Sequence, residues 1–165
     1  MRSGARQFRS WHRQRLDSPG FGRQEGAHDP FTRYEPPHRR VASLMTIGWK
    51  LHPEEREVLL AKFPPAYDNV VADHVTLQSD HGAGTPELPP PAHARIIGCA
   101  DDGSGCQAMV VEVAGSSARP TGGTYHITWS LGEGRRARES NDVIATHGFA
   151  AIDDDTRITL DPRAW

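Results

Sequence analysis

The chain has 165 residues, of which 36% are hydrophobic and 24% charged, and it contains 16 Gly and 13 Pro. This length accommodates one domain of ordinary size and argues against a two-domain enzyme. No run approaches the ~20 consecutive apolar residues that cross a bilayer, and the N-terminus lacks the apolar middle segment of a secretory signal. We therefore expect a cytoplasmic protein with no membrane partner; the oligomeric state is open, with a monomer as the expectation.

The net charge of -2 hides an uneven distribution of charge along the chain. Residues 1–44 contain nine Arg and four acidic residues, a balance of +5, whereas residues 45–165 contain 10 basic and 17 acidic residues, a balance of -7. Residues 1–44 also lack helical or strand periodicity, so we expect a disordered basic extension ahead of one domain at residues 45–165. A further hypothesis is that translation starts at Met45 and that the extension lies upstream of the true start.

The expected elements begin at residue 53. A helix is predicted at residues 53–63, because Pro53 suits its first position, acidic residues fill its first turn and Lys62 lies near its end. Runs rich in β-branched residues predict strands at residues 70–78, 94–100, 107–113, 124–131 and 156–160. Loops rich in Gly and Pro separate them at residues 79–91 and 114–123, and a short helix at residues 140–147 stops at Gly148. The predicted fold class is α+β with a mainly antiparallel sheet.

The two cysteines, Cys99 and Cys106, flank a turn signal between two of the predicted strands. We expect a hairpin there, with the two thiols across from each other. Without a secretion signal the thiols are expected to be reduced. Their spacing does not match half of a zinc site and no second Cys pair exists, so we assign them no role.

Two of the nine histidines stand apart because of the residues that follow them. Residues 74–77 and 126–129 read HVTL and HITW. Alternate side chains share one face of a strand, so His74 lies beside Thr76 and His126 beside Thr128, while Trp129 points into the core. If the two strands belong to one sheet, their polar faces converge on a single groove.

Two imidazoles with two hydroxyls suit phosphoryl chemistry. With an ordinary pKa of about 6.5, one ring can accept a proton from attacking water while the other donates a proton to the departing oxygen. Each threonine hydroxyl can donate a hydrogen bond to a nonbridging phosphate oxygen. We expect neither a metal nor a cofactor.

At these residues the sequence resembles the two-histidine (2H) phosphoesterases, whose hallmark is two His-x-Thr/Ser-x motifs on paired central strands. The resemblance covers at most residues 45–165 and implies two α/β lobes flanking a groove. It implies that His74 and His126 are the catalytic pair and that Thr76 and Thr128 contact phosphate. The implied reaction is metal-independent hydrolysis of a 2′,3′-cyclic phosphate at an RNA end or on a nucleotide, or of a related ADP-ribose cyclic phosphate.

Other side chains near the motifs are candidates for binding the rest of such a substrate. Arg135, Arg136 and Arg138 follow the second motif in a Gly-containing loop, and one of them is expected to bind the second phosphate of a nucleotide or an RNA backbone. Arg135 and Arg136 are the expected phosphate contacts. Tyr67 is the expected base-stacking residue. The alternative is a noncatalytic module that binds a nucleotide or an RNA end in the same groove. A zinc hydrolase has less support, because no His-Glu-x-x-His motif is present.

Overall fold

The structure is a computed structural model that describes residues 44–82 and 84–165. The extension predicted at residues 1–44 therefore lies almost wholly outside the described residues. Within the described part of the chain, no helix has both the length and the apolar character needed to cross a membrane.

The described residues form a mainly antiparallel sheet with two α-helices, which confirms the predicted α+β class. The strands are β1 (Met45–Leu51), β2 (Asn69–Val70), β3 (His74–His81), β4 (Ala92–Asp101), β5 (Cys106–Val113), β6 (His126–Leu131), β7 (Ala150–Ala151) and β8 (Arg157–Ala164). The helical elements are α1 (Pro53–Lys62), the 3-10 turn η1 (Ala137–Glu139) and α2 (Ser140–His147).

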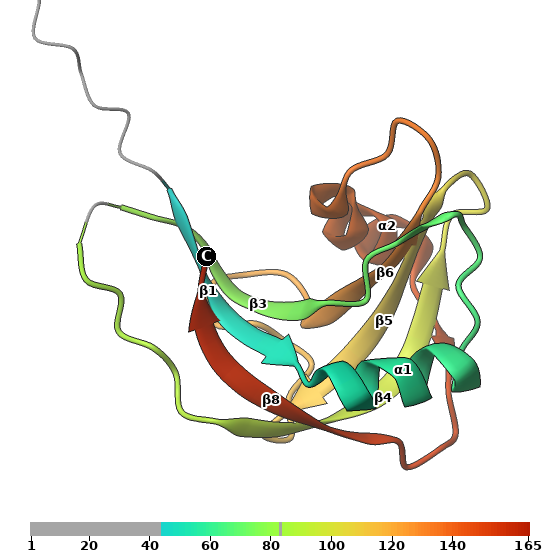
Figure 1. The fold of residues 1–165 in the computed structure, drawn as a ribbon. Coiled ribbons are helices and arrows are strands. Elements are labelled where there is room, and N and C mark those ends of the chain that lie inside the picture. The colour runs from blue at the N-terminus through green and yellow to red at the C-terminus, as the bar shows by residue number, and fades with distance from the viewer. Residues whose placement is uncertain (1–43, 83) are drawn as a thin grey trace, which may run out of the picture. The chain divides into compact units, whose positions relative to one another are not determined.

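The sheet curls back on itself, because its two ends come from one stretch of chain (Figure 1). The strand order is β2-β6-β5-β4-β8-β1-β3, with β7 paired to β4. The backbone N–H groups of Val71 and Ala72 continue the β2 pairing by donating to carbonyls of β6, each over 3.0 Å. From His74 onward the chain pairs with β1 instead, with His74 opposite Lys50. The single strand predicted at residues 70–78 is therefore two strands with different partners.

The change of partner coincides with an unusual backbone conformation at Ala72. This residue is fully buried and has φ +39°, a backbone conformation that residues other than glycine rarely adopt. Arg56 of α1 binds the two carbonyl groups at this point: its Nε donates to the Ala72 oxygen over 2.9 Å and its Nη2 to the Val71 oxygen over 3.2 Å. Charged donors satisfy the buried carbonyl groups that no strand pairs with.

Both faces of the sheet are partly covered, each by a different helix. One face forms the larger core, where Ile127 and Trp129 are fully buried and Leu59 of α1 packs against the cluster. Trp129 therefore points into the core, as predicted, and its indole N–H donates to the Phe63 carbonyl over 2.9 Å. On the opposite face, side chains of β4 and β5 pack in a second cluster with Val143 of α2.

Strands β1, β7 and β8 also differ from the sequence prediction, and β7 was not predicted. β1 was not predicted, although Ile47, Trp49 and Leu51 alternate as buried residues along it. β8 continues past the predicted end at residue 160 and includes Pro162. Thr46 and Trp165 exchange two backbone hydrogen bonds, so Pro162 falls at a position whose missing N–H would face away from β1. Proline therefore costs this ladder no hydrogen bond.

The predicted hairpin is formed by β4 and β5, but the cysteines do not face each other. Cys99 is opposite Met109 across the hairpin, whereas Cys106 is opposite Leu131 of β6. Both cysteines are free. The length of the turn sets this register, which composition alone does not reveal.

We predict that Gly48→Ala destabilises the domain by about 1–3 kcal/mol, because the added Cβ would collide with the Val75 carbonyl oxygen and force β3 away from β1. Gly84→Ala is the matched control, since nothing lies within 4 Å of its added Cβ. Urea unfolding of both variants measures the difference. Equal unfolding midpoints would contradict the close approach of the two strands.

Candidate functional site

A pocket of about 260 Å³ lies over β3 and β6, on the sheet face that also packs against α2. Both predicted histidines and both predicted threonines line it. The structure therefore brings His74, Thr76, His126 and Thr128 to one surface, although β3 and β6 are not paired with each other along this stretch. The remaining lining residues are Thr46, Ser79, Arg119, Ala137, Arg138, Asn141 and Trp165.

The His74 ring is fixed through its Nδ1 atom. This nitrogen lies 3.0 Å from a carboxylate oxygen of Asp73, which also forms an ion pair with Lys50. An ionised carboxylate only accepts hydrogen bonds, so Nδ1 carries the proton and Nε2 is the nitrogen available to a ligand. Partial burial opposes ionisation of Asp73, but the hydrogen bonds from Lys50 and His74 hold its pKa below the ordinary value.

The His126 ring is fixed in the same way by a different acceptor. Its Nδ1 lies 2.7 Å from the carbonyl oxygen of Thr124, two residues earlier in the chain. A carbonyl also only accepts, so the proton is on Nδ1 and Nε2 is available here too. Both imidazoles therefore present the same ring atom for chemistry, and only the group behind each ring differs.

The surroundings lower the pKa of both histidines below the ordinary imidazole value. Burial is the main cause for His74; Asp73 opposes it by favouring the charged ring, and the positive charge of Lys50 adds to the lowering. Burial is also the main cause for His126, where the Thr124 carbonyl opposes it and the positive charges of Arg119 and His74 add to the lowering. Protonation is therefore favoured by a carboxylate at His74 and disfavoured by a guanidinium at His126.

The two threonines have different surroundings. The Thr128 side chain is buried, and its hydroxyl lies 2.9 Å from the Ser140 hydroxyl and 3.3 Å from the Ala137 carbonyl oxygen. Thr76 is half-buried, and its hydroxyl forms no hydrogen bond within the described part of the chain. Thr76 thus has a hydroxyl free for a ligand, whereas Thr128 also attaches η1 and α2 to the sheet.

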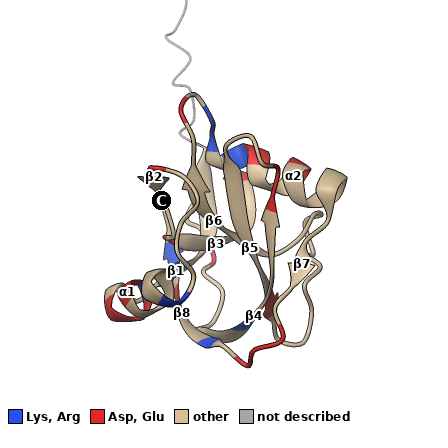
Figure 2. Cartoon of the chain, turned by 90° about the vertical axis from the view of Figure 1, so that its right-hand side faces the viewer, with Lys and Arg blue, Asp and Glu red and all other residues tan. Residues whose placement is uncertain are grey.

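The pocket is electropositive within an acidic domain. Arg119, from the loop before β6, and Arg138, from η1, line it, and none of its lining residues is acidic. The stretch at residues 45–165 carries a net charge of -7, and acidic residues colour much of α1 and of the turns in Figure 2. An acid-free pocket with two guanidiniums in such a domain is suited to an anion.

Trp165 forms the wall of the pocket next to His74. The centroids of the two rings are 4.7 Å apart, and the Lys50 ammonium lies 4.9 Å from the centre of the Trp165 ring. The Trp165 residue is 39% exposed, so part of its indole surface remains open. Backbone pairing of residue 165 with Thr46 extends β8 and places this ring at the site.

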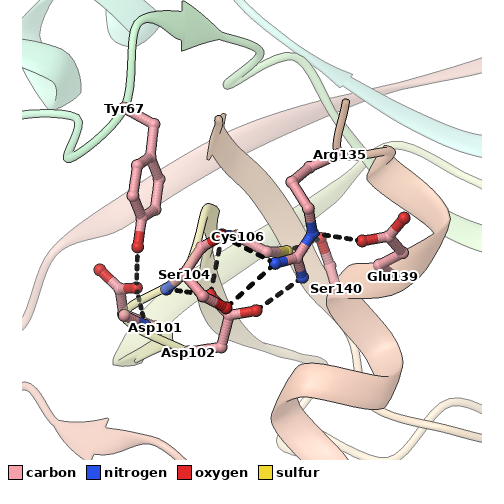
Figure 3. Close-up of polar contacts among 9 residues, drawn as sticks. Tyr67, Asp101, Asp102, Ser104, Cys106, Arg135, Glu139 and Ser140 are labelled. Atoms are coloured by element: carbon pink, nitrogen blue, oxygen red, sulfur yellow. Dashed lines mark hydrogen bonds and ion pairs between the residues drawn. The ribbon is translucent and has the colours of Figure 1, made fainter. Parts of the chain in front are cut away.

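The structure places Arg135 outside the lining of this pocket, away from the two motifs. Figure 3 shows its guanidinium directed at the β4–β5 turn and at η1, where it bonds to Asp102 over 2.6 Å, Glu139 over 2.5 Å and the Ser104 carbonyl over 3.0 Å. Burial opposes ionisation of Asp102, but hydrogen bonds from Ser104 and Arg135 hold its pKa well below the ordinary value. Arg135 is thus an anchor for the segment that carries Arg138.

Arg136 and Tyr67 are also absent from the pocket lining. Arg136 is exposed on the segment that leads to η1. The Tyr67 hydroxyl donates to Asp101 over 2.6 Å at the end of β4, so the base-stacking role predicted for this residue has no place at the histidines (Figure 3). The sequence offered the right residue types for these roles but not their positions.

Among the residues at the site that sequence reasoning missed are Asp73, Arg119, Asn141 and Trp165. Asp73 directly precedes the first motif and was detectable as a partner for an imidazole. Of the other three, Arg119 lies in the loop before β6, Asn141 at the start of α2 and Trp165 just after β8, and no motif in the sequence associates them with the histidines. Within residues 44–82 and 84–165, no three His, Cys, Asp or Glu side chains group so as to hold a metal ion.

Replacing the two threonines should separate their roles. We predict that Thr128→Val lowers the free energy of unfolding by about 1–2 kcal/mol. The substitution removes a buried hydroxyl, and the buried Ser140 hydroxyl loses its hydrogen bond to Thr128. Thr76→Val should change stability by less than ~0.5 kcal/mol. Urea unfolding measures both, and equal losses would contradict the structural role of Thr128.

No protein-family model, no curated protein and no solved structure matches this chain.

Proposed function

We propose that this protein is a metal-independent cyclic phosphodiesterase of the two-histidine type, which hydrolyses a 2′,3′-cyclic phosphate at an RNA end or on a nucleotide. One observation carries the proposal: two imidazoles, each with Nδ1 committed to an acceptor, line one acid-free pocket together with two guanidiniums. The two rings can supply base and acid to one phosphorus atom, and the guanidiniums can hold its charge.

The groups behind the rings favour one assignment of roles. Asp73 favours a charged His74 ring more strongly than Lys50 opposes it, whereas His126 has only the neutral Thr124 carbonyl to favour charge and Arg119 to disfavour it. His126 is therefore the base: its Nε2 takes a proton from water while the water oxygen forms a bond to phosphorus. His74 is the acid: its Nε2 proton passes to the ribose oxygen as the bond from that oxygen to phosphorus breaks. The product is a phosphate monoester on the neighbouring ribose oxygen.

The remaining pocket residues stabilise the substrate and the charge that develops on it. The free hydroxyl of Thr76 donates to a nonbridging phosphate oxygen, and Arg119, which lies within electrostatic reach of His126, neutralises the second negative charge of the forming monoester. The open part of the Trp165 ring is the aromatic surface at the pocket on which a nucleobase can stack.

The direct test is hydrolysis of adenosine 2′,3′-cyclic phosphate and of an RNA oligonucleotide ending in such a phosphate. We predict that His74→Ala and His126→Ala each reduce kcat by 10²- to 10⁴-fold, the range typical of general acid–base groups. EDTA should leave the rate unchanged. His93→Ala is the matched control, because His93 is an exposed strand histidine outside this pocket.

Circular dichroism of each alanine variant checks that the fold is retained. The proposal is wrong if the wild-type protein opens neither substrate, or if both alanine variants keep the wild-type rate. Binding of the cyclic phosphate without turnover would instead indicate a noncatalytic binding module.

The lowered histidine pKa values predict the pH dependence. The reactive form has one neutral and one protonated ring, so kcat/KM is bell-shaped with its maximum midway between the two pKa values of the pair. Because both pKa values lie below the ordinary value, the maximum should fall below about pH 6.5. Asp73→Asn removes the charge that favours protonated His74, so its maximum should shift further toward acid pH.

Asp155→Asn serves as the control for this shift, since Asp155 pairs only with Arg157 on the exposed surface among the described contacts. A maximum above pH 7, or a shift of Asp73→Asn toward alkaline pH, would contradict the assignment of the acid.

A further inference from the structure

The pocket carries more positive charge than one cyclic phosphodiester requires. Such a diester has a single negative charge, and the protonated histidine already opposes it during reaction. Arg119 and Arg138 add two permanent positive charges to the same lining. Isolated like charges repel, so two guanidiniums at one pocket indicate a ligand with more than one anionic group.

Arg119 is held in place on the side of the pocket formed by α2. Its Nε donates to the Gly122 carbonyl over 2.7 Å. The side chain of Asn141, in the first turn of α2, accepts the Thr124 N–H over 3.1 Å. An added Cβ on Gly123 would lie 2.9 Å from the Arg119 Nη2 and 2.8 Å from the Asn141 Nδ2, so these two side chains are neighbours at one point.

Arg138 belongs to the same side of the pocket, three residues before Asn141. It is exposed and, among the described residues, forms no ion pair with an acidic side chain, whereas Arg135, Arg95 and Arg157 each do. Arg119 likewise has no acidic partner in the described part of the chain. We call Arg119, Arg138 and Asn141 the arginine rim. Its two guanidiniums are not paired with a carboxylate among the described residues, although the domain has an excess of acidic side chains.

We propose that the arginine rim binds a second phosphate of the substrate, attached to the 5′ oxygen of the nucleotide whose 2′,3′-cyclic phosphate lies between the histidines. This inference rests on the proposed function for the position of the first phosphate. In such a substrate the first phosphate bridges the 2′ and 3′ oxygens of a ribose. The second phosphate is attached to the 5′ oxygen of the same ribose. Arg119, nearer to His126, contacts both phosphates, and the exposed Arg138 contacts the second.

The substrate class is therefore a nucleotide with phosphate on both sides of one ribose. A 5′-phosphorylated mononucleotide and the last nucleotide of an RNA share this chemistry, because the internucleotide diester of the RNA occupies the same 5′ position. The acidic charge of the rest of the domain disfavours contact with a long phosphate backbone, so recognition extends over one further phosphate.

Calorimetric titration of the full chain with stable product forms tests the second site without requiring turnover. We expect adenosine 3′,5′-bisphosphate to bind at least tenfold more tightly than adenosine 3′-monophosphate. Arg138→Gln should reduce this ratio to less than threefold. Arg136→Gln is the matched control and should keep the tenfold ratio, because Arg136 is an exposed arginine two residues away that does not line the pocket.

A dinucleotide with a terminal 3′-phosphate distinguishes the two sources of the second phosphate. If the dinucleotide binds as tightly as the bisphosphate, the second site binds the internucleotide phosphate of an RNA end. If the dinucleotide binds more weakly, the second site binds the 5′-phosphate of a free nucleotide. Equal binding of the bisphosphate and the monophosphate overturns the second site but leaves the proposed function standing. Equal loss of the ratio in Arg138→Gln and Arg136→Gln also overturns it. Failure of all ligands to bind overturns the proposed function as well.

Discussion

The site depends on one constraint, the change of strand partner at Ala72. Before this residue the chain pairs with β6, and after it the chain pairs with β1. The left-handed conformation of Ala72 makes the change abrupt, and the hydrogen bonds from Arg56 compensate the carbonyls that leave the ladder. The two ends of the curled sheet meet at this residue. His74 therefore lies at the start of β3, and His126 lies close to it on β6. Without the change of partner the two motifs would belong to opposite ends of an open sheet.

The pocket is assembled from parts with different tolerance to change. The histidines and threonines lie on strands whose alternate side chains, such as Val75 and Ile127, are fully buried. The arginines come from a loop and from η1, which are fastened by polar contacts: Asn141 to the loop before β6, and Arg135 to the β4–β5 turn. The strands that carry the rings are thus positioned by packing, and the segments that carry the arginines are positioned by polar contacts.

The two histidines show how similar motifs acquire different chemistry. Each ring donates from Nδ1, and the motifs match at the imidazole and the hydroxyl. The difference lies behind and beside the rings, in a carboxylate at His74 and a guanidinium near His126. In the proposed mechanism, this asymmetry assigns the acid to His74 and the base to His126. It also extends to the threonines, since only Thr128 is built into the contact with α2.

The sequence by itself determined the fold class, the helix after Pro53, the hairpin, the inward orientation of Trp129 and the pairing of each histidine with a threonine on one strand face. These follow from local periodicity and turn chemistry. Only the tertiary structure decided that β3 and β6 meet, that Arg119 and Trp165 join them, and that Arg135 and Tyr67 do not. Those outcomes depend on how a curled sheet brings distant strand ends together, and on which carboxylates lie within reach of each side chain. Neither is encoded in the spacing of residues along the chain.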